Sequence, residues 1–382
     1  MEAPVSRAIE KLTHPLLWAE VNTGHLAHNA RMLRSLVSPG VATLAVVKAN
    51  AYGHGLTGVA KALQEHVDGF GVSSLAEAVR LRRSGIRHPV LIFGHLAADE
   101  FRQAFEWDLS LSVSDVEYGM WLGSEAQRTG LKAKIHVKVD TGMGRFGIPL
   151  REALRGLQDL ARWPVLELEG LYTHLAQAEK SGDGFTRTQI SRFSDLRKTL
   201  DEQGLQFAWV HAGASSAVVQ YPESHFSLIR PGLMLYGLYP HPSLKGLVSL
   251  KPALTLRAKW VLIKKIAAGD TVGYGRTYIA DRDTWIGILP MGYSHGYPWG
   301  LSGKSKVFYR GVFYSVIGRI SMDSIAVDLG SATEAAGGED AVLMGGEEGA
   351  GIPIEELAGG MGTIPYEIVS RLDPGIPRIY RD

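Results

Sequence analysis

The chain contains no cysteine among its 382 residues. Without a thiol it can form no disulfide, use no thiolate nucleophile and bind no metal through sulfur. The sequence shows no other arrangement of residues typical of a metal site, so we predict no metal. Disulfide-stapled proteins and enzymes that depend on a thiol are thereby excluded.

The chain also has no marked excess of positive or negative charge. Lysine and arginine total 40 and aspartate and glutamate total 39, which leaves a formal net charge of +1. This balance gives no electrostatic reason to expect nucleic acid or an anionic membrane as a partner. No apolar run reaches membrane-spanning length, and the first 20 residues carry Glu2, Arg7, Glu10 and Lys11 where a leader would have an apolar core. We therefore expect a cytoplasmic protein.

The chain does contain a regular alternation of apolar runs and helical segments. After an isolated first strand near residues 16–21, strand-like runs are predicted at 44–48, 68–72, 89–93, 109–113, 134–139, 166–172, 207–211 and 228–230. Capping boxes at Ser74 with Glu77 and at Ser114 with Glu117 predict two of the helix starts. The pattern is typical of an α/β protein with a (β/α)8 TIM-type barrel over residues 14–240. An open doubly wound sheet is the alternative, because a sequence cannot show closure.

The pattern changes after Pro240-His241-Pro242. Strands separated by glycine-rich turns are predicted at 250–263, 285–289, 306–309, 313–317, 324–328 and 341–344, with a short helix at 353–358. This composition predicts a mostly β C-terminal domain over residues 241–382. We expect the residues before about 22 to pack with it.

Lys48 stands at the end of the first apolar run of the predicted barrel. A lysine at the end of a buried strand loses hydration, so its pKa can fall far enough to make the amine a nucleophile or a base. One chemistry that needs such a lysine is imine formation with an aldehyde cofactor. Most lysines are simply exposed to solvent. A solvated strand-end lysine is therefore the alternative to a lysine that binds a cofactor.

Other polar residues follow the later strands. Arg145 lies after the fifth run, His174 after the sixth, Ser216 after the seventh and Arg230 at the end of the eighth. Active sites of (β/α)8 barrels lie at the C-terminal ends of the strands, and phosphate is often held after strands seven and eight. Small residues suited to close approach by a phosphate surround Ser216, namely Gly213, Ser215 and Gly232.

Residues 47–55, Val-Lys-Ala-Asn-Ala-Tyr-Gly-His-Gly, closely resemble the cofactor-lysine motif of the alanine racemases. Further matches are Asp-Thr-Gly-Met-Gly-Arg at 140–145, Ile-Arg-Pro-Gly at 229–232 and Gly-Tyr-Gly-Arg-Thr at 273–277. The resemblance covers nearly the whole chain, from about residue 16 to 380. It implies a barrel followed by a β domain, with pyridoxal 5'-phosphate bound to Lys48.

The resemblance also implies roles for individual residues. It places Arg230 against the cofactor's pyridine nitrogen, with His174 orienting that region. Contacts to the phosphate would come from Tyr52, Ser216, Gly232, Leu233 and Tyr366. Contacts to the substrate would come from Arg145, Met322 and Asp323. Lys138 matches a lysine that many members of the family carry as a carbamate.

The reaction implied is interconversion of L-alanine and D-alanine by two bases. Lys48 would handle the proton of the D-isomer, and Tyr274, reaching in from the other subunit of a homodimer, that of the L-isomer. D-alanine would supply peptidoglycan. A serine, lysine or broad-specificity racemase is the alternative, because Ser215, Ser321 and Ser324 and the pair 294–295 depart from residues common in the family.

Two other classes with the same barrel fit less well. A decarboxylase would use an acidic residue at the pyridine nitrogen and a reactive cysteine, whereas this chain has Arg230 and no cysteine. A non-catalytic cofactor-binding protein would be a single barrel, without a second domain or Tyr274.

Overall fold

The computed structural model describes residues 15–331, 340–347 and 349–382. The N-terminal charges that argue against a leader therefore lie outside the described residues. Within the described residues, no helix combines the length and the apolar character needed to cross a bilayer. The chain forms two compact units: residues 25–52 and 56–251 make one, and residues 15–24, 53–55 and 252–382 make the other.

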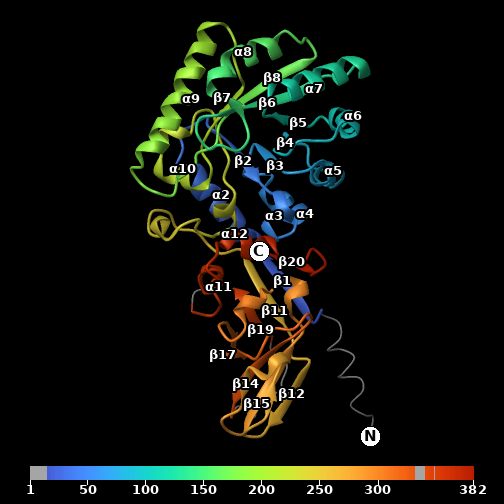
Figure 1. Cartoon of the computed structure of the whole chain (residues 1–382), viewed down its shortest axis with the longest axis vertical. Helices are drawn as coiled ribbons and strands as arrows, with labels where there is room; N and C mark the ends of the chain where they lie inside the picture. The colour runs from blue at the N-terminus through green and yellow to red at the C-terminus, as the bar shows by residue number, and fades with distance from the viewer. Residues whose placement is uncertain (1–14, 332–339, 348) are drawn as a thin grey trace. The chain divides into compact units, whose positions relative to one another are not determined.

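The first unit is the predicted parallel barrel (Figure 1). Its strands are β2 (Ala42–Val46), β3 (Gly69–Val72), β4 (Val90–Ile92), β5 (Ser110–Val113), β6 (Ala133–Asp140), β8 (Leu166–Tyr172), β9 (Trp209–His211) and β10 (Leu228–Ile229). A two-residue strand, β7 (Ile148–Pro149), pairs with β6. Every residue of β2 to β5 is buried, as expected for parallel strands covered on both faces. All eight predicted strands are confirmed, with ends that differ by one or two residues.

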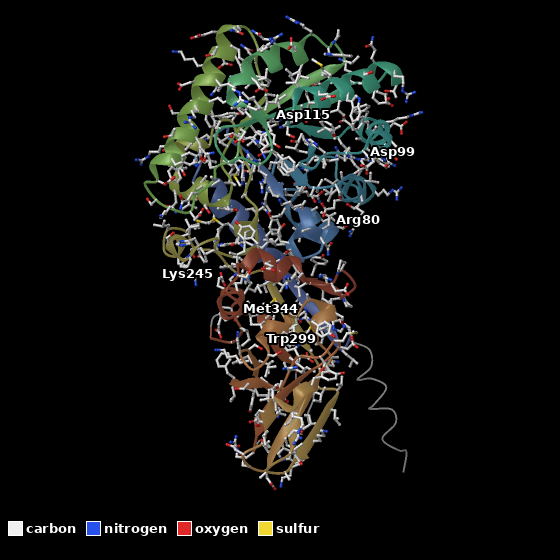
Figure 2. The ribbon with its side chains drawn as sticks, in the orientation of Figure 1. Arg80, Asp99, Asp115, Lys245, Trp299 and Met344 are labelled. Carbon is white, nitrogen blue, oxygen red and sulfur yellow. The ribbon has the colours of Figure 1, made fainter. Side chains whose placement is uncertain are left out.

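Helices follow the strands and cover the outside of the barrel (Figure 1). They are α2 (Thr23–Arg34), α4 (Leu56–Leu63), α5 (Leu75–Arg83), α6 (Phe101–Glu106), α7 (Val116–Thr129), α8 (Leu150–Ala161), α9 (Gly184–Glu202) and α10 (Ser215–Gln220). A short turn, α3 (Lys48–Tyr52), lies between β2 and α4. The capping box predicted at Ser114 is wrong. Asp115, labelled in Figure 2, caps α7 by accepting the Tyr118 N–H at 2.7 Å, whereas the Ser114 hydroxyl lies 2.5 Å from His95 Nε2.

The barrel closes between two short strands, β9 and β10. The hydrogen-bonded order runs β10-β2-β3-β4-β5-β6-β8-β9, so the last seam lies between β9 and β10. There, a single parallel bridge joins Ala214 to Arg230, and the Arg230 N–H donates to the Gly213 carbonyl at 2.8 Å. This irregular seam decides between the two predicted architectures in favour of a nearly closed barrel. It also places Arg230 beside the loop that follows β9.

The second unit is built on a nine-stranded sheet. Its strands are β1 (Leu17–Asn22), β11 (Leu254–Ala258), β12 (Leu262–Ile266), β15 (Thr284–Leu289), β16 (Lys306–Tyr309), β17 (Val312–Ile317), β18 (Ile325–Gly330), β19 (Ala341–Gly345) and β20 (Arg378–Arg381). The order is β12-β15-β18-β17-β16-β19-β11-β1-β20. A separate hairpin of β13 (Thr271–Val272) and β14 (Tyr278–Ile279) and the helices α11 (Ile354–Met361) and α12 (Pro365–Ser370) complete the unit.

Two predictions for this unit need correction. The single strand predicted over residues 250–263 is two strands, β11 and β12, separated by Lys259–Val261. The first strand of the chain is not isolated: β1 pairs antiparallel with β11 and parallel with β20. Its pattern of apolar residues predicted a strand, but a pattern within one segment says nothing about a partner more than 230 positions away.

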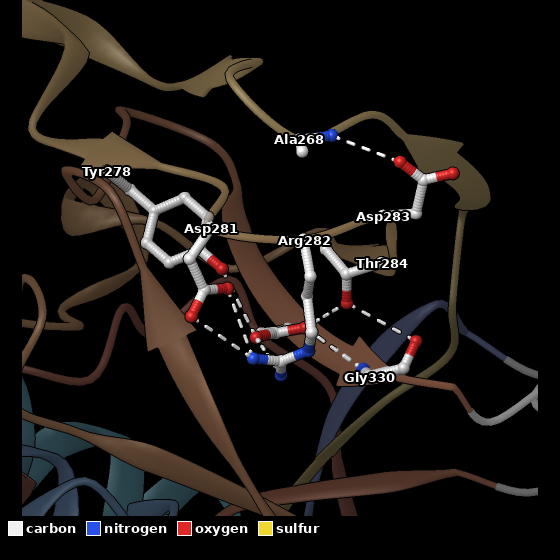
Figure 3. A network of polar contacts seen from close by, with 8 residues as sticks. Ala268, Tyr278, Asp281, Arg282, Asp283, Thr284 and Gly330 are labelled. Carbon is white, nitrogen blue, oxygen red and sulfur yellow. Dashed lines mark hydrogen bonds and ion pairs between the residues drawn. The ribbon is translucent and has the colours of Figure 1, made fainter.

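A polar cluster fixes the end of the sheet near β12, as Figure 3 shows. Asp328 on β18 accepts hydrogen bonds from Thr284 Oγ1 at 2.6 Å and from Tyr278 Oη at 3.2 Å. Arg282 lies 3.6 Å from the same carboxylate. Because Tyr278 belongs to β14 and Thr284 to β15, one carboxylate ties the small hairpin to the large sheet.

Candidate functional site

Lys48 follows the buried end of β2 with only Val47 between them, and an uncommon piece of backbone comes after it. Ala49, Asn50, Ala51 and Tyr52 all have φ between 51° and 54°, which makes α3 a left-handed helical turn. We call residues 49–52 the left-handed turn. Such a conformation costs about 1–2 kcal/mol for each residue with a side chain. Strain of this size persists only where the surrounding structure enforces it, and it is characteristic of functional sites.

Glu77 on α5 binds the left-handed turn through its carboxylate. Its Oε1 accepts the Asn50 N–H at 3.1 Å, while its Oε2 accepts the N–H and the hydroxyl of Ser73, both at 3.0 Å. The Asn50 side chain in turn accepts the Leu56 N–H at 3.0 Å. The predicted capping box is therefore only half right: Ser74 caps α5 by accepting the Glu77 N–H, but the Glu77 carboxylate binds the left-handed turn.

Lys48 itself is exposed as a residue, yet its amine sits among like charges. Burial of the amine, followed in size by repulsion from Arg145, lowers the pKa of Lys48, and the Glu77 carboxylate opposes the shift. A lowered pKa increases the share of free amine at neutral pH, which is the form that can act as a nucleophile or a base. The structure thus gives Lys48 the environment that its place at a strand end predicts.

Arg145 lies in a loop that Asp140 shapes. The Asp140 carboxylate, at the end of β6, accepts the N–H groups of Gly142, Met143 and Gly144 at 2.8–3.2 Å. A carboxylate that accepts successive backbone amides fixes a tight turn. The turn formed by Asp140 and the glycines therefore determines the position of Arg145, which follows it.

Lys138 points into the barrel two residues before Asp140. It is buried, and its amine lies 5.7 Å from the ring centre of Phe146 and 5.6 Å from that of Tyr172. Burial, then the nearby charges of Arg230 and Arg145, lower the pKa of Lys138 to about 8. With this pKa, roughly a tenth of Lys138 is uncharged at pH 7.

Arg230 is the most enclosed cation of the site. Its guanidinium donates to the carbonyls of Thr173 at 2.8 Å and Ala212 at 3.1 Å, and to His211 Nδ1 at 2.5 Å. Burial lowers the pKa of Arg230 to about 10, so it stays charged at neutral pH. Its guanidinium also lies 5.2 Å from the ring centre of Tyr172. These contacts hold the charged guanidinium of Arg230 in one orientation.

Two histidines beside Arg230 are held neutral. His174 Nδ1 lies 3.5 Å from the guanidinium, and burial followed by the charge of Arg230 lowers the pKa of His174 to about 3. Burial, and again Arg230, lower the pKa of His211 well below its ordinary value. Neutral imidazoles can accept the guanidinium N–H groups, which an imidazolium could not do.

The loop after β9 and the residues after β10 form a second part of the site. Ser215 Oγ accepts the N–H of Gly232 at 2.9 Å and that of Met234 at 3.5 Å. A Cβ on Gly232 would lie 2.8 Å from the Tyr52 hydroxyl, so any larger residue here would displace that hydroxyl. Ser216 and Leu233 occupy the first turns of α10 and of a 3₁₀ helix (Leu233–Tyr236), where N–H groups are left without helical acceptors.

The four remaining predicted site residues belong to the other unit. Tyr274 opens a 3₁₀ turn between Gly273 and Gly275, and 70% of its surface is exposed. Met322 is exposed, and Asp323 accepts a hydrogen bond from Ser294 Oγ at 3.0 Å. Tyr366 lies on α12. Trp299, labelled in Figure 2, helps to line a cavity of this unit with Tyr293 and Arg371.

The structure therefore brings nine of the thirteen predicted site residues together on the barrel. These are Lys48, Tyr52, Lys138, Arg145, His174, Ser216, Arg230, Gly232 and Leu233. Sequence reasoning missed His211 and Glu77 as parts of the site, and it predicted Ser215 only as a small residue beside the phosphate. The sequence did mark both residues, His211 as the end of a predicted strand and Glu77 as part of a helix cap. Only the structure shows which groups their side chains bind.

The sequence matches two family models over almost its full length. "Alanine racemase, N-terminal domain" matches residues 21–240, and "Alanine racemase, C-terminal domain" matches residues 253–380. The chain is 39% identical over 367 residues to the alanine racemase of Desulforamulus reducens, covering 95% of this chain and 98% of that protein. It is also 39% identical over 366 residues to that of Carboxydothermus hydrogenoformans, covering 95% and 99%.

Solved structures agree. The alanine racemase of Clostridium difficile 630 superposes with a TM-score of 0.92 at 32% identity, covering 97% of this chain and 96% of that one. The enzyme from Streptomyces lavendulae, a producer of D-cycloserine, superposes with a TM-score of 0.89 at 34% identity, covering 97% and 98%. From its sequence, its fold and the residues assembled at the barrel mouth, the chain belongs to the alanine racemase family.

Proposed function

We propose that the chain interconverts L-alanine and D-alanine with pyridoxal 5'-phosphate held at the mouth of the barrel. The observation that carries this proposal is the cluster of Lys48, Lys138, Arg145 and Arg230, whose mutual repulsion contributes to the lowered pKa values of the lysines. Four cationic side chains converging on one site call for a ligand rich in negative charge. The cofactor's phosphate and phenolic oxygen and the substrate's carboxylate supply that charge.

The donor set fits this cofactor. Lys48 offers an amine with a lowered pKa for its aldehyde, and Arg230 offers a fixed cation for its ring nitrogen. Tyr52, Ser216, Gly232 and Leu233, together with Tyr366, would hold its phosphate. When bound, pyridoxal 5'-phosphate supplies a conjugated ring that takes up the electron pair left on Cα after a proton is removed.

The residues of the chain then have separate tasks. Lys48 takes or returns the Cα proton on the D side, and Tyr274 of the partner subunit does so on the L side. Arg145 holds the substrate carboxylate, and Met322 and Asp323 contact the substrate. The high exposure of Tyr274 on a glycine-flanked turn supports its reaching another subunit. A homodimer with shared sites follows from this assignment.

Arg230 has a further consequence for the reaction. A guanidinium cannot give up its proton at neutral pH, so it leaves the ring nitrogen of the cofactor unprotonated. The ring is then a weaker acceptor of electrons. Proton return to Cα is favoured over side reactions such as transamination.

Lys138 would be carried as a carbamate. Its pKa of about 8 leaves enough free amine to attack CO2, which forms a C–N bond and releases one proton. The product is an anion that can accept hydrogen bonds from Arg145 and neutralise part of the cationic cluster. Labelling with 13CO2 should give a carbamate carbon resonance that disappears in Lys138→Ala. Persistence of the resonance in that variant would place the modification elsewhere.

The experiment that tests the function compares Lys48→Ala with Lys61→Ala, a change of an exposed lysine on α4. After incubation with pyridoxal 5'-phosphate, we expect an absorbance near 420 nm, the usual imine band, in wild type and Lys61→Ala only. Chiral chromatography should show D-alanine formed from L-alanine by the same two proteins. Binding of the cofactor without racemisation of any amino acid would refute the proposal.

Exchange in D2O tests the two bases separately. Tyr274→Phe should still exchange the α-hydrogen of D-alanine for deuterium but should lose exchange from L-alanine. Equal loss with both isomers would refute the assignment. Faster turnover of L-serine or L-lysine than of alanine would favour the serine, lysine or broad-specificity racemase, which the serines at 215, 294, 321 and 324 leave open. Growth without added D-alanine, in a strain lacking its own racemase, tests supply to peptidoglycan.

A further inference from the structure

A line of polar side chains, buried except at the partly exposed Glu169, crosses the inside of the barrel from Arg230 to Glu169. Arg230 Nη1 lies 2.5 Å from His211 Nδ1, His211 Nε2 lies 2.8 Å from His136 Nδ1, and His136 Nε2 lies 3.0 Å from the Glu169 carboxylate. Ser110 Oγ donates to the same carboxylate. We call these four side chains, from Arg230 to Glu169, the barrel relay. Only its first member belongs to the predicted site.

The two ends of the barrel relay fix where its protons lie. A guanidinium can only donate and a carboxylate can only accept. His211 therefore accepts at Nδ1 and donates from Nε2, and His136 does the same. All three hydrogen bonds then run in one direction, from the arginine toward the glutamate. A proton on Nδ1 of either ring would set a donor against a donor and break the line.

The backbone is built to seat the middle of the relay. A Cβ on Gly170 would lie 2.3 Å from His136 Nδ1, so the ring packs directly on the backbone of β8. The pairing of β6 with β8 shifts register between Ile135 and His136. The Tyr172 ring stacks on His211, with ring centres 4.7 Å apart and planes 8° apart. Both imidazoles are thus held in place independently of their hydrogen bonds.

The relay supplies a partner for a buried charge. Arg230 is 4% exposed, and no ion pair joins it to a carboxylate within the described parts of the chain. Leaving a buried charge unpaired is costly. Glu169 is the carboxylate at the far end. Its burial would raise its pKa, but the hydrogen bonds from His136 and Ser110 outweigh this and hold the pKa of Glu169 below its ordinary value.

We propose that Glu169 is the remote counter-charge of Arg230 and that His136 and Glu169 are positioning residues for it. The two neutral histidines transmit the polarisation of the carboxylate without transferring a proton. They hold the guanidinium charged and correctly turned toward the barrel mouth. The consequence for catalysis rests on the proposed function, in which Arg230 faces the ring nitrogen of the cofactor.

The tautomers can be measured without the cofactor. In cofactor-free protein labelled with 15N-histidine, both His136 and His211 should show a protonated Nε2 and an unprotonated Nδ1. Assignment comes from His136→Asn and His211→Asn. A ring protonated at Nδ1, or at both nitrogens, near neutral pH would overturn the relay. This outcome is independent of any activity.

Catalysis is tested with Glu169→Gln, which keeps an acceptor for His136 but removes the charge. Glu167→Gln, the same change at an exposed position of the same strand, is the matched control. We expect kcat for alanine to fall about tenfold in Glu169→Gln, equivalent to one pKa unit of lost interaction, with KM within about twofold. A kcat equal to that of Glu167→Gln would overturn the role of Glu169. If wild type racemises nothing, the proposed function fails, and the tautomers still decide the relay.

Discussion

The left-handed turn after Lys48 offers a test in which two identical substitutions should have opposite effects. Ala49 has φ of 54° and is exposed. Ala76, on α5, is equally exposed but lies in a right-handed helix. Glycine adopts positive φ without penalty, whereas in a right-handed helix it is less stable than alanine. Ala49→Gly should therefore stabilise the barrel, and Ala76→Gly should destabilise it.

The magnitudes follow from the backbone. Removing the left-handed strain at Ala49 stabilises the native state by about 1–2 kcal/mol. The greater freedom of glycine in the unfolded chain offsets about 0.4–1 kcal/mol of this gain. The net gain is roughly 0.5–1 kcal/mol, and because Ala49 is exposed, little buried methyl surface is lost. Ala76→Gly should cost roughly 0.5–1 kcal/mol. The two variants should differ by about 1–2 kcal/mol, or roughly 2–8 °C in Tm.

Thermal denaturation of the cofactor-free protein, followed by far-UV circular dichroism, measures this difference. Wild type should melt between the two variants. The argument would be refuted if Ala49→Gly melted below wild type, since the left-handed turn would then carry no strain that glycine can relieve. If Ala49→Gly lost cofactor affinity while its Tm rose, the strain in the left-handed turn would be needed to orient Lys48 toward the cofactor.

Three further outcomes are expected. Mixing Lys48→Ala with Tyr274→Phe, each inactive as a homodimer, should restore about a quarter of wild-type activity, because half of randomly paired dimers contain one intact site out of two; no recovery after verified subunit exchange would argue against shared sites. His174 and His211 have lowered pKa values, so below pH ~6.5 the unfolded chain binds protons that the native state does not, and stability should fall by about 1.4 kcal/mol per pH unit for each ring; a Tm unchanged between pH 7.5 and 5.5 would contradict this. Glu77→Gln removes a charge that opposes the lowered pKa of Lys48, so that pKa should fall further and hydrogen exchange in the left-handed turn should quicken; unchanged exchange would assign the restraint to other contacts.

The extent to which sequence predicts this protein differs between its parts. Strands of the barrel were predictable because each is a short apolar run bounded by turn residues, and Lys48 stood out because it ends such a run. Closure between β9 and β10 was not predictable, since it depends on one bridge and on loop hydrogen bonds. The pairing of β1 with β20 joins segments at opposite ends of the described chain, and no local pattern encodes it.

Side-chain partners were the hardest part to foresee. The sequence marks Ser215 as a departure from the family's asparagine, but only the structure shows its hydroxyl accepting the N–H groups of Gly232 and Met234. The left-handed turn could not be inferred either, because alanine and tyrosine rarely adopt positive φ. There is a physical reason why the sequence does not reveal this turn: part of what holds it comes from outside the segment, where Glu77 accepts the Asn50 N–H.

The position of β1 between β11 and β20 has a consequence for biosynthesis. β1 leaves the ribosome before any strand of the barrel, but its antiparallel partner β11 is translated only after Pro252. At about 5–20 residues per second, β1 waits roughly ten to fifty seconds with both edges unpaired. The barrel strands are complete in the meantime and can fold first. A nascent chain stalled after β10 should therefore bind holdase chaperones through residues 17–22, and release of those chaperones should coincide with synthesis of β11.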